Sequence, residues 1–559
     1  MKPISCADEK KDERLQKAQA VAAYESERKS QRELAEELNI PRPTLQYWIA
    51  QKGQIDAEPA LIEFFESAVG IAFLHRLVVA MHFVITMQGA GSVRTVCSLL
   101  ELSGIEQFVA SAYGSQRAVT VEMEEAIVAY GQAEASRLGA EMPAKAITVC
   151  ADETFHPEVC LVAIEPVSNY IVLEEYAPDR TAETWTASMA ASLNGLPVAV
   201  IQGTSDEAKA LCHHIEHDLG AHQSPDLFHV QHTASKATMA PLGRQIRTAE
   251  KAVEQAEKKV QKEQALQAKY LNRTPRPVGR PPAFEKHIAA AQAEVSQAQR
   301  QLASALERKV QATDAIQGIS ECYHPYDLET GAPRDATAVA ESLATQFDTL
   351  ETIAAEAALS ERAVNNIHKA RRVVTKMVAT ITFFFLTVQA KVQALTLTPE
   401  QEDALYHALI PAIYLNLVAD KAATADERHT LRQRSRQLLE PLLEPDSPLA
   451  AMEQDEKQRL ESVATECAQL FQRASSCTEG RNGQLALRHH ALHRISSRKL
   501  SALTVVHNFF IQRPDGSTPA QRFFEADHPR LFDFLLDHVD LPGRPAKKRP
   551  PPASLTLLL

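Results

Sequence analysis

Two carboxylates follow short apolar runs in residues 146–232, the only part of the chain with a sustained strand signal. Asp152 ends the run Ile147 to Ala151, and Asp206 comes after a run that begins at Pro197. If these strands are neighbours, both acids meet at one edge of a sheet. Oxygen ligands without Cys or His suit Mg²⁺ or Mn²⁺ and phosphoryl transfer with two metal ions. The alternative is that each Asp is a turn residue or a helix cap.

Five β-rich runs and two stretches with helical spacing make up this region. Their order is three strands, helix, strand, helix, strand, which predicts a mixed five-stranded sheet with helices packed on it. The strands are expected at Ile147 to Ala151, Val159 to Ile164, Tyr170 to Leu173, Pro197 to Ile201 and Leu227 to Val230, and the helices at Arg180 to Leu193 and Glu207 to Leu219.

The neighbours of the two acids need separate interpretations. Glu153 adjoins Asp152, but successive strand residues face opposite sides of a sheet, so only one can point at a metal, and we assign Asp152. Asp226 is interpreted as an accessory or capping residue, and His229 as a hydrogen-bond partner or phosphate contact. The Cys and His concentration from Cys212 to His232 leaves zinc as an alternative, although it lacks CxxC and HExxH spacing.

Length and composition predict a multidomain protein without a membrane segment. The chain has 559 residues, 45% hydrophobic and 23% charged, and eight scattered cysteines that read as reduced thiols of a cytosolic protein. The first residues are too charged for a signal peptide, and the apolar helix Met377 to Val388 is too short to span a bilayer, so we expect it in a core. The net charge of −12 argues mildly against a nucleic-acid protein, but DNA contacts are local, and the chain from Arg481 on is basic.

Residues 27–52 have the pattern of a helix-turn-helix unit. Ser30 and Glu33 form a capping box, a turn follows at Asn39, and the second helix carries Leu45 and Trp48 as inward-packing residues. In that geometry the second helix enters the major groove of DNA. The side chains expected to face base edges or phosphates are Arg42, Thr44, Gln46 and Tyr47. The alternative is a plain helical hairpin.

The rest of the chain is predicted to be helical. Residues 56–144 form a second block, in which Ser92 to Ile105 again resembles a helix-turn-helix or serves packing. Arg244 to Lys269 and Pro282 to Ile316 are expected to pair as a coiled-coil hairpin. Its tip, Gly279-Arg280-Pro281 with Arg276, and a similar stretch at Arg544 resemble AT-hooks, which lie in the minor groove, or are Pro-rich linkers.

A helix that begins near Ser475 places Glu479 in its first turns. If this helix packs back on the sheet, Glu479 supplies a third oxygen ligand. The sheet domain is then interrupted by a large helical insertion, residues 244–472.

These features together resemble the bacterial insertion-sequence DDE transposases of the RNase H-like, retroviral integrase superfamily. The resemblance covers nearly the whole chain and rests on the order of a helix-turn-helix, CADET around Asp152, GTSDEA around Asp206, FHV, a helical insertion and TEGRNG around Glu479. The tyrosine-arginine-glutamate-lysine signature of some subfamilies is absent, so the subfamily and the route of strand transfer stay open.

The resemblance implies an RNase H-like core in which Asp152, Asp206 and Glu479 hold two Mg²⁺ or Mn²⁺ ions, with Asn482 accessory to the third acid. The expected partners are the terminal inverted repeats of the element, target DNA and a second copy of the chain, in the bacterial cytoplasm at the nucleoid. Arg481, Arg488 and Arg498 are expected to neutralise phosphates. The alternatives are an RNase H-like nuclease that does not join strands and a domesticated DNA-binding regulator.

The expected domains follow from this interpretation. They are a helix-turn-helix domain at 1–56, a second helical domain at 57–144, the first part of the catalytic core at 145–243, the helical insertion at 244–472, the closing helices with the third acid at 473–530 and a basic Pro-rich tail at 531–559.

Overall fold

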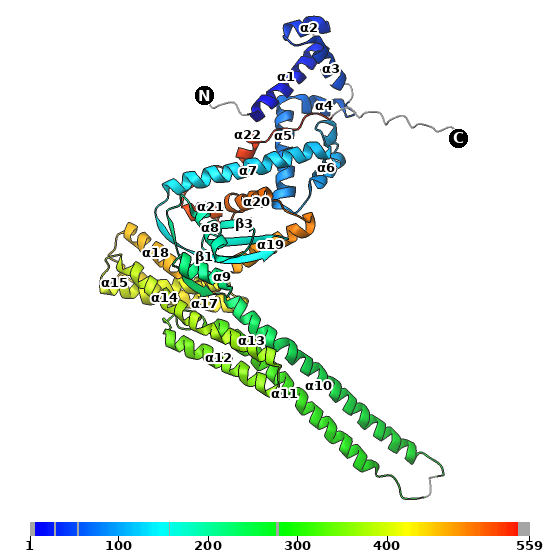
Figure 1. Cartoon of the computed structure of the whole chain (residues 1–559), viewed down its shortest axis with the longest axis vertical. Helices are drawn as coiled ribbons and strands as arrows, with labels where there is room; N and C mark the ends of the chain where they lie inside the picture. The colour runs from blue at the N-terminus through cyan, green and yellow to red at the C-terminus, as the bar shows by residue number, and fades with distance from the viewer. Residues whose placement is uncertain (1–5, 27–28, 53–54, 156, 276–278, 546–559) are drawn as a thin grey trace. The chain divides into compact units, whose positions relative to one another are not determined.

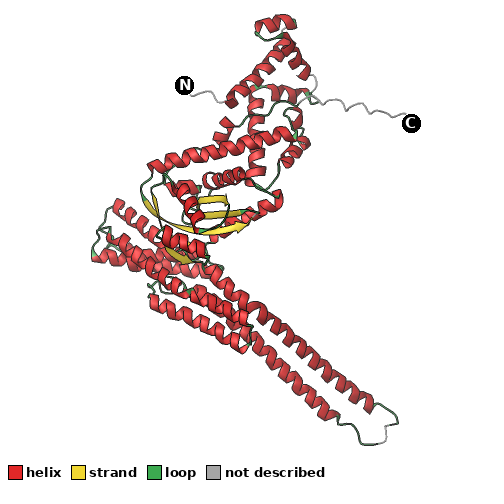
Figure 2. Ribbon diagram, in the orientation of Figure 1, coloured by secondary structure: helices red, strands yellow, loops and turns green. Residues whose placement is uncertain are grey.

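The computed structural model describes residues 6–26, 29–52, 55–155, 157–275 and 279–545 (Figure 1; Figure 2). Its chain divides into two compact units. Unit 1 combines Met1–Val200 with Cys477–Leu559, and unit 2 is Ile201–Ser476. The chain therefore leaves unit 1 after Val200 and returns to it at Cys477, close to Glu479. The division falls at Val200, inside the predicted core segment 145–243.

The sheet is mixed and has five strands in the order β3-β2-β1-β4-β5. The first three strands form an antiparallel meander in which Asp152 of β1 lies opposite Val162 of β2. The fourth and fifth strands are parallel, with Ser205 opposite Pro225. The strands are β1 (Lys145–Phe155), β2 (Val159–Glu165), β3 (Tyr170–Ala177), β4 (Val198–Ser205) and β5 (His222–Pro225).

Two strand predictions need correction. Asp152 lies inside β1, because the strand continues to Phe155. The predicted strand Leu227 to Val230 is wrong: these residues open the long helix α10 (Leu227–Leu271), and the fifth strand is His222–Pro225 instead. The side chain of Asp226 accepts a hydrogen bond from the backbone N–H of Phe228, so it caps the helix that follows and ends the extended segment.

In unit 1, helices pack on strands β1, β2 and β3 and build the core with them. Buried residues of β1, β2 and α7 pack against those of the C-terminal helices, for example Ile127, Val162 and Leu503. The helices of unit 1 are α1 (Cys6–Ser26), α2 (Gln31–Glu37), α3 (Arg42–Lys52), α4 (Pro59–Glu66), α5 (Ala68–His82), η1 (Phe83–Gln88), α6 (Val93–Leu102), η2 (Ile105–Gln107), α7 (Tyr113–Glu141), α8 (Ala182–Leu193), α19 (Ser476–Leu492), α20 (Ser497–Phe509), α21 (Pro519–Phe524) and α22 (Leu531–His538).

Unit 2 is a helical body from which a two-helix hairpin extends. Its core packs Phe347, Ile381 and Phe384 with residues of α10 and α11, and no strand follows β5 among the described residues. Its remaining elements are α9 (Lys209–His213), η3 (His214–Asp218), α11 (Phe284–Cys322), α12 (Ala336–Glu356), α13 (Glu361–Arg372), α14 (Val374–Gln393), α15 (Pro399–Ala404), η4 (Leu405–Leu409), α16 (Ile410–Asp420), α17 (Ala425–Leu439), η5 (Glu440–Leu443) and α18 (Gln454–Gln469).

The hairpin of α10 and α11 confirms the predicted coiled-coil arms. Ala291, Ala298, Ala305 and Ala312 of α11 are buried at intervals of seven residues, as expected for a coiled-coil seam with small side chains. Across the seam the ammonium of Lys259 lies 2.6 Å from the carboxylate of Glu294. Small seam residues let the two helices approach closely along their length.

Two helical stretches, Ala68–Gln88 and Glu361–Gln393, are long and apolar enough to cross a membrane by length and composition alone. Both are partly buried inside the protein. Val78 of the first and Phe384 of the second lie in hydrophobic cores. The expectation of a core helix at Met377 to Val388 is confirmed within α14, because Met377, Ile381, Phe384 and Val388 are buried there.

Candidate active site

Asp152 and Glu153 have different partners, as their alternation in β1 requires. The carboxylate of Glu153 accepts hydrogen bonds from Arg180 Nη1 at 3.0 Å and from Trp185 Nε1 at 3.3 Å. Asp152 Oδ2 accepts a hydrogen bond from Asn482 Nδ2 at 2.8 Å. Glu153 thus binds Trp185 of α8 and Arg180 just before that helix, whereas Asp152 binds Asn482 of α19.

The α19 helix carries both Glu479 and Asn482, three residues apart and therefore on one helix face. Because Asn482 reaches Asp152, this face lies against β1, which is the packing that the sequence argument required of the third acid. Glu479 lies in the first turn of the helix and is exposed. The structure therefore brings Asp152 and the segment with Glu479 and Asn482 together within unit 1.

A buried ion pair fixes α19 against the sheet. Arg481 donates from Nε and Nη2 to the two carboxylate oxygens of Glu174 in β3, at 2.7 and 2.6 Å, and the side chains are 6% and 0% exposed. The hydroxyl of Thr504 donates to the same carboxylate at 2.6 Å. Burial opposes the charge of Arg481, but Glu174 outweighs this effect and raises the pKa of Arg481. The planar bidentate geometry restrains α19, the helix that carries Glu479, against β3.

The other predicted acids end the two parallel strands of unit 2. Asp206 follows Ser205 of β4, and Asp226 follows Pro225 of β5, so the two lie at one edge because these strands pair in register. Both line a cleft of roughly 230 Å³ together with His229. The edge of a parallel sheet at its carboxyl end is a common place for a binding site.

Asp226 and Asp206 differ in how far local hydrogen bonds occupy them. Asp226 is buried, and its carboxylate accepts from the N–H of Phe228 at 2.7 Å and from the N–H and hydroxyl of Ser475. Asp206 is partly exposed, and its Oδ1 accepts from the N–H of Ala208 at 2.9 Å. The capping role expected for Asp226 is confirmed. His229 Nε2 lies 4.0 Å from Asp226 Oδ2.

The predicted acids share a donor type that suits a hard divalent cation. Asp152, Asp206 and Glu479 offer carboxylate oxygens, and Mg²⁺ is commonly held by one or two protein carboxylates with substrate phosphates and water. Among the described residues, no group of three or more His, Cys, Asp or Glu side chains is placed to hold a metal ion, in the Cys212 to His232 segment or elsewhere.

Four arginines predicted to contact DNA are engaged inside unit 1. Arg481 binds Glu174, and Arg488 donates to the backbone carbonyls of Met87, Gln88 and Gly89 at 2.5 to 2.9 Å. Arg498 pairs with Glu124 at 2.9 Å, and Arg544 pairs with Glu66. Protein acceptors already bind all four guanidinium groups, so these arginines serve the fold and the expectation that they neutralise DNA phosphates is not supported.

The helix-turn-helix prediction agrees with the local structure. The side chain of Ser30 accepts from Glu33 N, and that of Glu33 accepts from Ser30 N, which confirms the capping box. In α3 Leu45 is buried and Trp48 is half-buried, while Arg42, Gln46 and Tyr47 are exposed and Thr44 is half-buried. At the hairpin tip Arg280 is exposed, and Arg276 lies outside the described residues.

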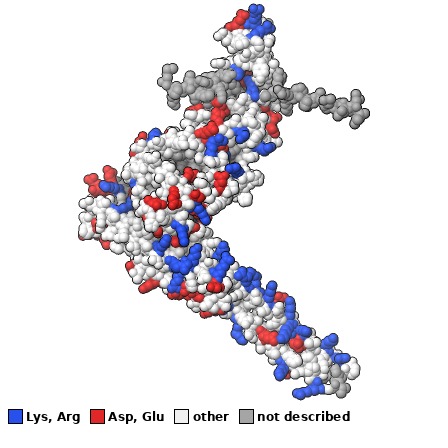
Figure 3. All heavy atoms as spheres, in the orientation of Figure 1, with Lys and Arg blue, Asp and Glu red and all other residues white. Residues whose placement is uncertain are grey.

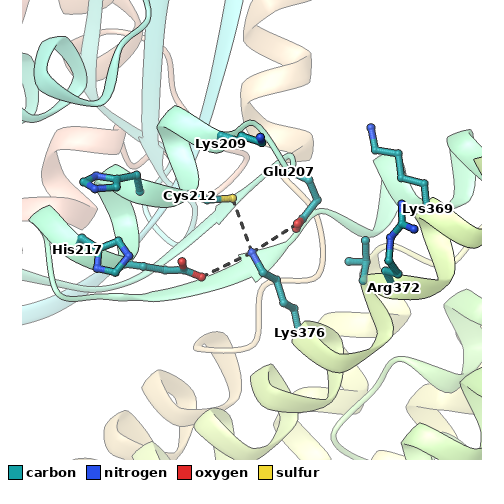
Figure 4. A pocket seen from close by; sticks show the side chains of 10 residues that line it. Glu207, Lys209, Cys212, His217, Lys369, Arg372 and Lys376 are labelled. Carbon is teal, nitrogen blue, oxygen red and sulfur yellow. Dashed lines mark hydrogen bonds and ion pairs between the residues drawn. The ribbon is translucent and has the colours of Figure 1, made fainter.

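Sequence reasoning missed a second cleft in unit 2, lined by α9, α13 and the start of α14 (Figure 4). Its cations are Lys209, Lys369, Arg372 and Lys376. The signal was present as the run KARRVVTK from Lys369 to Lys376, but a basic helix end is common on any protein surface.

Residues 405–551 match a family described only as a family of unknown function (DUF6399). No curated protein matches the chain significantly. The matched region includes Glu479 and Asn482 but neither Asp152 nor Asp206.

Proposed function

We propose that the chain is a DDE-type DNA transposase that binds the ends of its element and catalyses metal-dependent cleavage and transfer of DNA strands. The observation that carries this proposal is the 2.8 Å hydrogen bond from Asn482 to Asp152, since it places the helix of Glu479 on the Asp152 face of β1. Asp206, at the end of β4, completes the proposed triad.

The protein groups have distinct roles in this proposal. Asp152, Asp206 and Glu479 would hold two Mg²⁺ or Mn²⁺ ions, which when bound stabilise the attacking and leaving oxygens of an in-line displacement. Asn482 orients the Asp152 carboxylate by occupying Oδ2, and the Arg481–Glu174 pair fixes the helix that carries Asn482. Glu153 is held away by Arg180 and Trp185, so it does not compete with Asp152.

Basic and helix-turn-helix elements support DNA as the partner. In a chain of net charge −12, the hairpin from Arg244 to Lys309 holds fourteen Lys and Arg against seven Asp and Glu. Figure 3 shows Lys and Arg side chains along this hairpin. Such local positive charge attracts phosphates whatever the net charge. In the same proposal α3 binds the terminal repeats of the element, and the chain acts on target DNA as a dimer. This reaction takes place at the nucleoid in the cytoplasm.

A strand-joining assay tests the function. The purified full chain is incubated in Mg²⁺ with a supercoiled plasmid and with labelled duplexes taken from the DNA that flanks its own gene on each side. The proposal predicts label covalently joined to the plasmid. Nicking without joining would favour the RNase H-like nuclease, and duplex binding without any cleavage would favour the regulator; either result contradicts a transposase.

A further inference from the structure

The cleft between α9 and α13 within unit 2 encloses about 500 Å³. One wall carries Lys209, His213 and His217, and the other carries Lys369, Arg372 and Lys376. Figure 4 shows Lys369 and Arg372 across the cleft from Lys209 and Cys212. Four Lys and Arg side chains face two carboxylates, those of Glu207 and Glu216, so the cleft has a net positive charge.

Lys376 is the structural cation of this cleft. Its ammonium donates to Gln223 Oε1 at 2.9 Å and lies 3.4 Å from Glu207 and 3.6 Å from Glu216. Burial opposes its charge, but the neighbouring Cys212, Glu207 and Glu216 raise the pKa of Lys376 above the ordinary value. Lys376 therefore neutralises part of the charge of both carboxylates and links the segment around α9 to α14.

Lys209, Lys369 and Arg372 have no such neutralisation. In the part of the chain that the structure describes, no ion pair joins any of the three to a carboxylate, and all three are exposed. Arg371, next to Arg372 on α13, shows the contrast: it lies 2.7 Å from Asp348 and 2.6 Å from Glu351. Lys369 and Arg372 are three residues apart and share one helix face.

The basic cleft is continuous with the acidic one. Both clefts are lined by Glu207, Lys369 and Val373. The lining of the joined clefts therefore extends from Asp206 and Asp226 through Lys369 to Arg372. A ligand that fits both ends must present one group to the carboxylates and a further anion to the cations. A nucleic-acid strand repeats an anionic phosphodiester at every nucleotide. One phosphate can therefore meet the cations, while a divalent ion of the proposed function would hold its neighbour at the carboxylates.

We propose that Lys369 and Arg372 bind the phosphodiester backbone of a nucleic-acid strand whose neighbouring phosphate lies at Asp206. This inference rests on the proposed function, which supplies the reaction at Asp206. Lys209 faces the same strand from the opposite wall, and Lys376 keeps the walls together.

The experiment measures the dissociation constant of the full chain for a labelled duplex of arbitrary sequence, and for the matching single strand, between about 50 and 200 mM salt. The double variant Lys369→Ala with Arg372→Ala is compared with Arg371→Ala, the neutralised neighbour. The slope of log Kd against log salt is expected to fall by about 1.8 for duplex or about 1.4 for single strand in the double variant, since each contact contributes about 0.9 or 0.7. Arg371→Ala is expected to keep the wild-type slope.

A double variant with the wild-type slope overturns the proposal, as does an equal loss in Arg371→Ala. Lys369→Gln with Arg372→Gln retains side-chain size and gives the same reading if the alanine variant unfolds. Asp206→Asn separates this proposal from the function: it is expected to lose cleavage and keep the slope. If Asp206→Asn still cleaves, the assigned reaction fails, and the salt slopes still decide whether Lys369 and Arg372 bind phosphates.

Discussion

The cations of α19 and those of α13 have opposite environments. Arg481 is buried and bidentate to Glu174, and Arg488 is used by three backbone carbonyls. Lys369 and Arg372 are exposed beside a cleft and have no ion pair among the described residues. Charge in a sequence thus does not by itself indicate a phosphate contact, because the fold can already supply the acceptors for an arginine.

Among the variants that test this comparison, the largest effect on stability is expected at Arg481. Arg481→Met leaves the Glu174 carboxylate buried without its partner, and the free energy of unfolding should fall by about 3 to 5 kcal/mol. Urea titration followed by circular dichroism measures it. The double variant Arg481→Met with Glu174→Leu should recover most of the loss, because removing both charges leaves no orphan. A loss below about 1 kcal/mol for the single variant would show that the pair does not hold α19.

The same buried charge contributes to a pH dependence. Burial lowers the pKa of His507 to about 4, and the Arg481 charge adds to this effect. The unfolded chain takes up this proton near the ordinary pKa of about 6.5, so stability decreases as the pH falls from about 6.5 to 4. Between pH 7 and about pH 4.5 the wild type should lose about 2 to 3 kcal/mol more than His507→Gln.

Urea titrations at the two pH values test this prediction, with Lys369→Ala as the control. Because Lys369 is exposed, its variant should follow the wild-type pH profile. Equal losses in the wild type and His507→Gln would mean that His507 titrates alike in the folded and unfolded chain.

A smaller effect is expected at Asn482. Asn482→Ala removes the hydrogen bond to Asp152. Under the proposed function strand cleavage should then fall about 10- to 100-fold, the usual loss when the hydrogen-bond partner of a metal ligand is removed. His490→Ala, an exposed change on the same helix, should retain activity. Initial rates of plasmid nicking at saturating Mg²⁺ measure both. An unchanged rate for Asn482→Ala would show that the hydrogen bond from Asn482 to Asp152 has no part in cleavage, and it would contradict the role given to this contact.

Periodicity predicted the parts of the fold that depend on local pattern. The capping box at Ser30 and the paired arms of the hairpin were expected from spacing alone, and four of the five strands were placed within a few residues. Leu227 to Val230 was assigned as a strand because a short apolar run fits a strand and a buried helix turn equally well. The capping hydrogen bond of Asp226 decides between them.

The candidate site was less predictable because its geometry depends on contacts between residues that are far apart in the chain. Alternation along β1 predicts that Asp152 and Glu153 face opposite sides of the sheet, and their separate partners agree with this. Nothing local shows that Arg481 meets Glu174 or that Arg544 meets Glu66, since these partners are hundreds of residues away. The basic run from Lys369 to Lys376 becomes informative about a binding site only when the structure shows that Arg371 is neutralised whereas Lys369 and Arg372 are not.

The most direct test of the central claim compares Asp152→Asn, Asp206→Asn and Glu479→Gln with Glu153→Gln in the strand-joining assay. If the three acids act as one set, each of the first three changes abolishes joining, and combining two causes no further loss. Glu153→Gln should retain joined product, because Glu153 is bound to Arg180 and Trp185. Joined product from any of the three acid variants, or its loss in Glu153→Gln alone, would contradict the assignment.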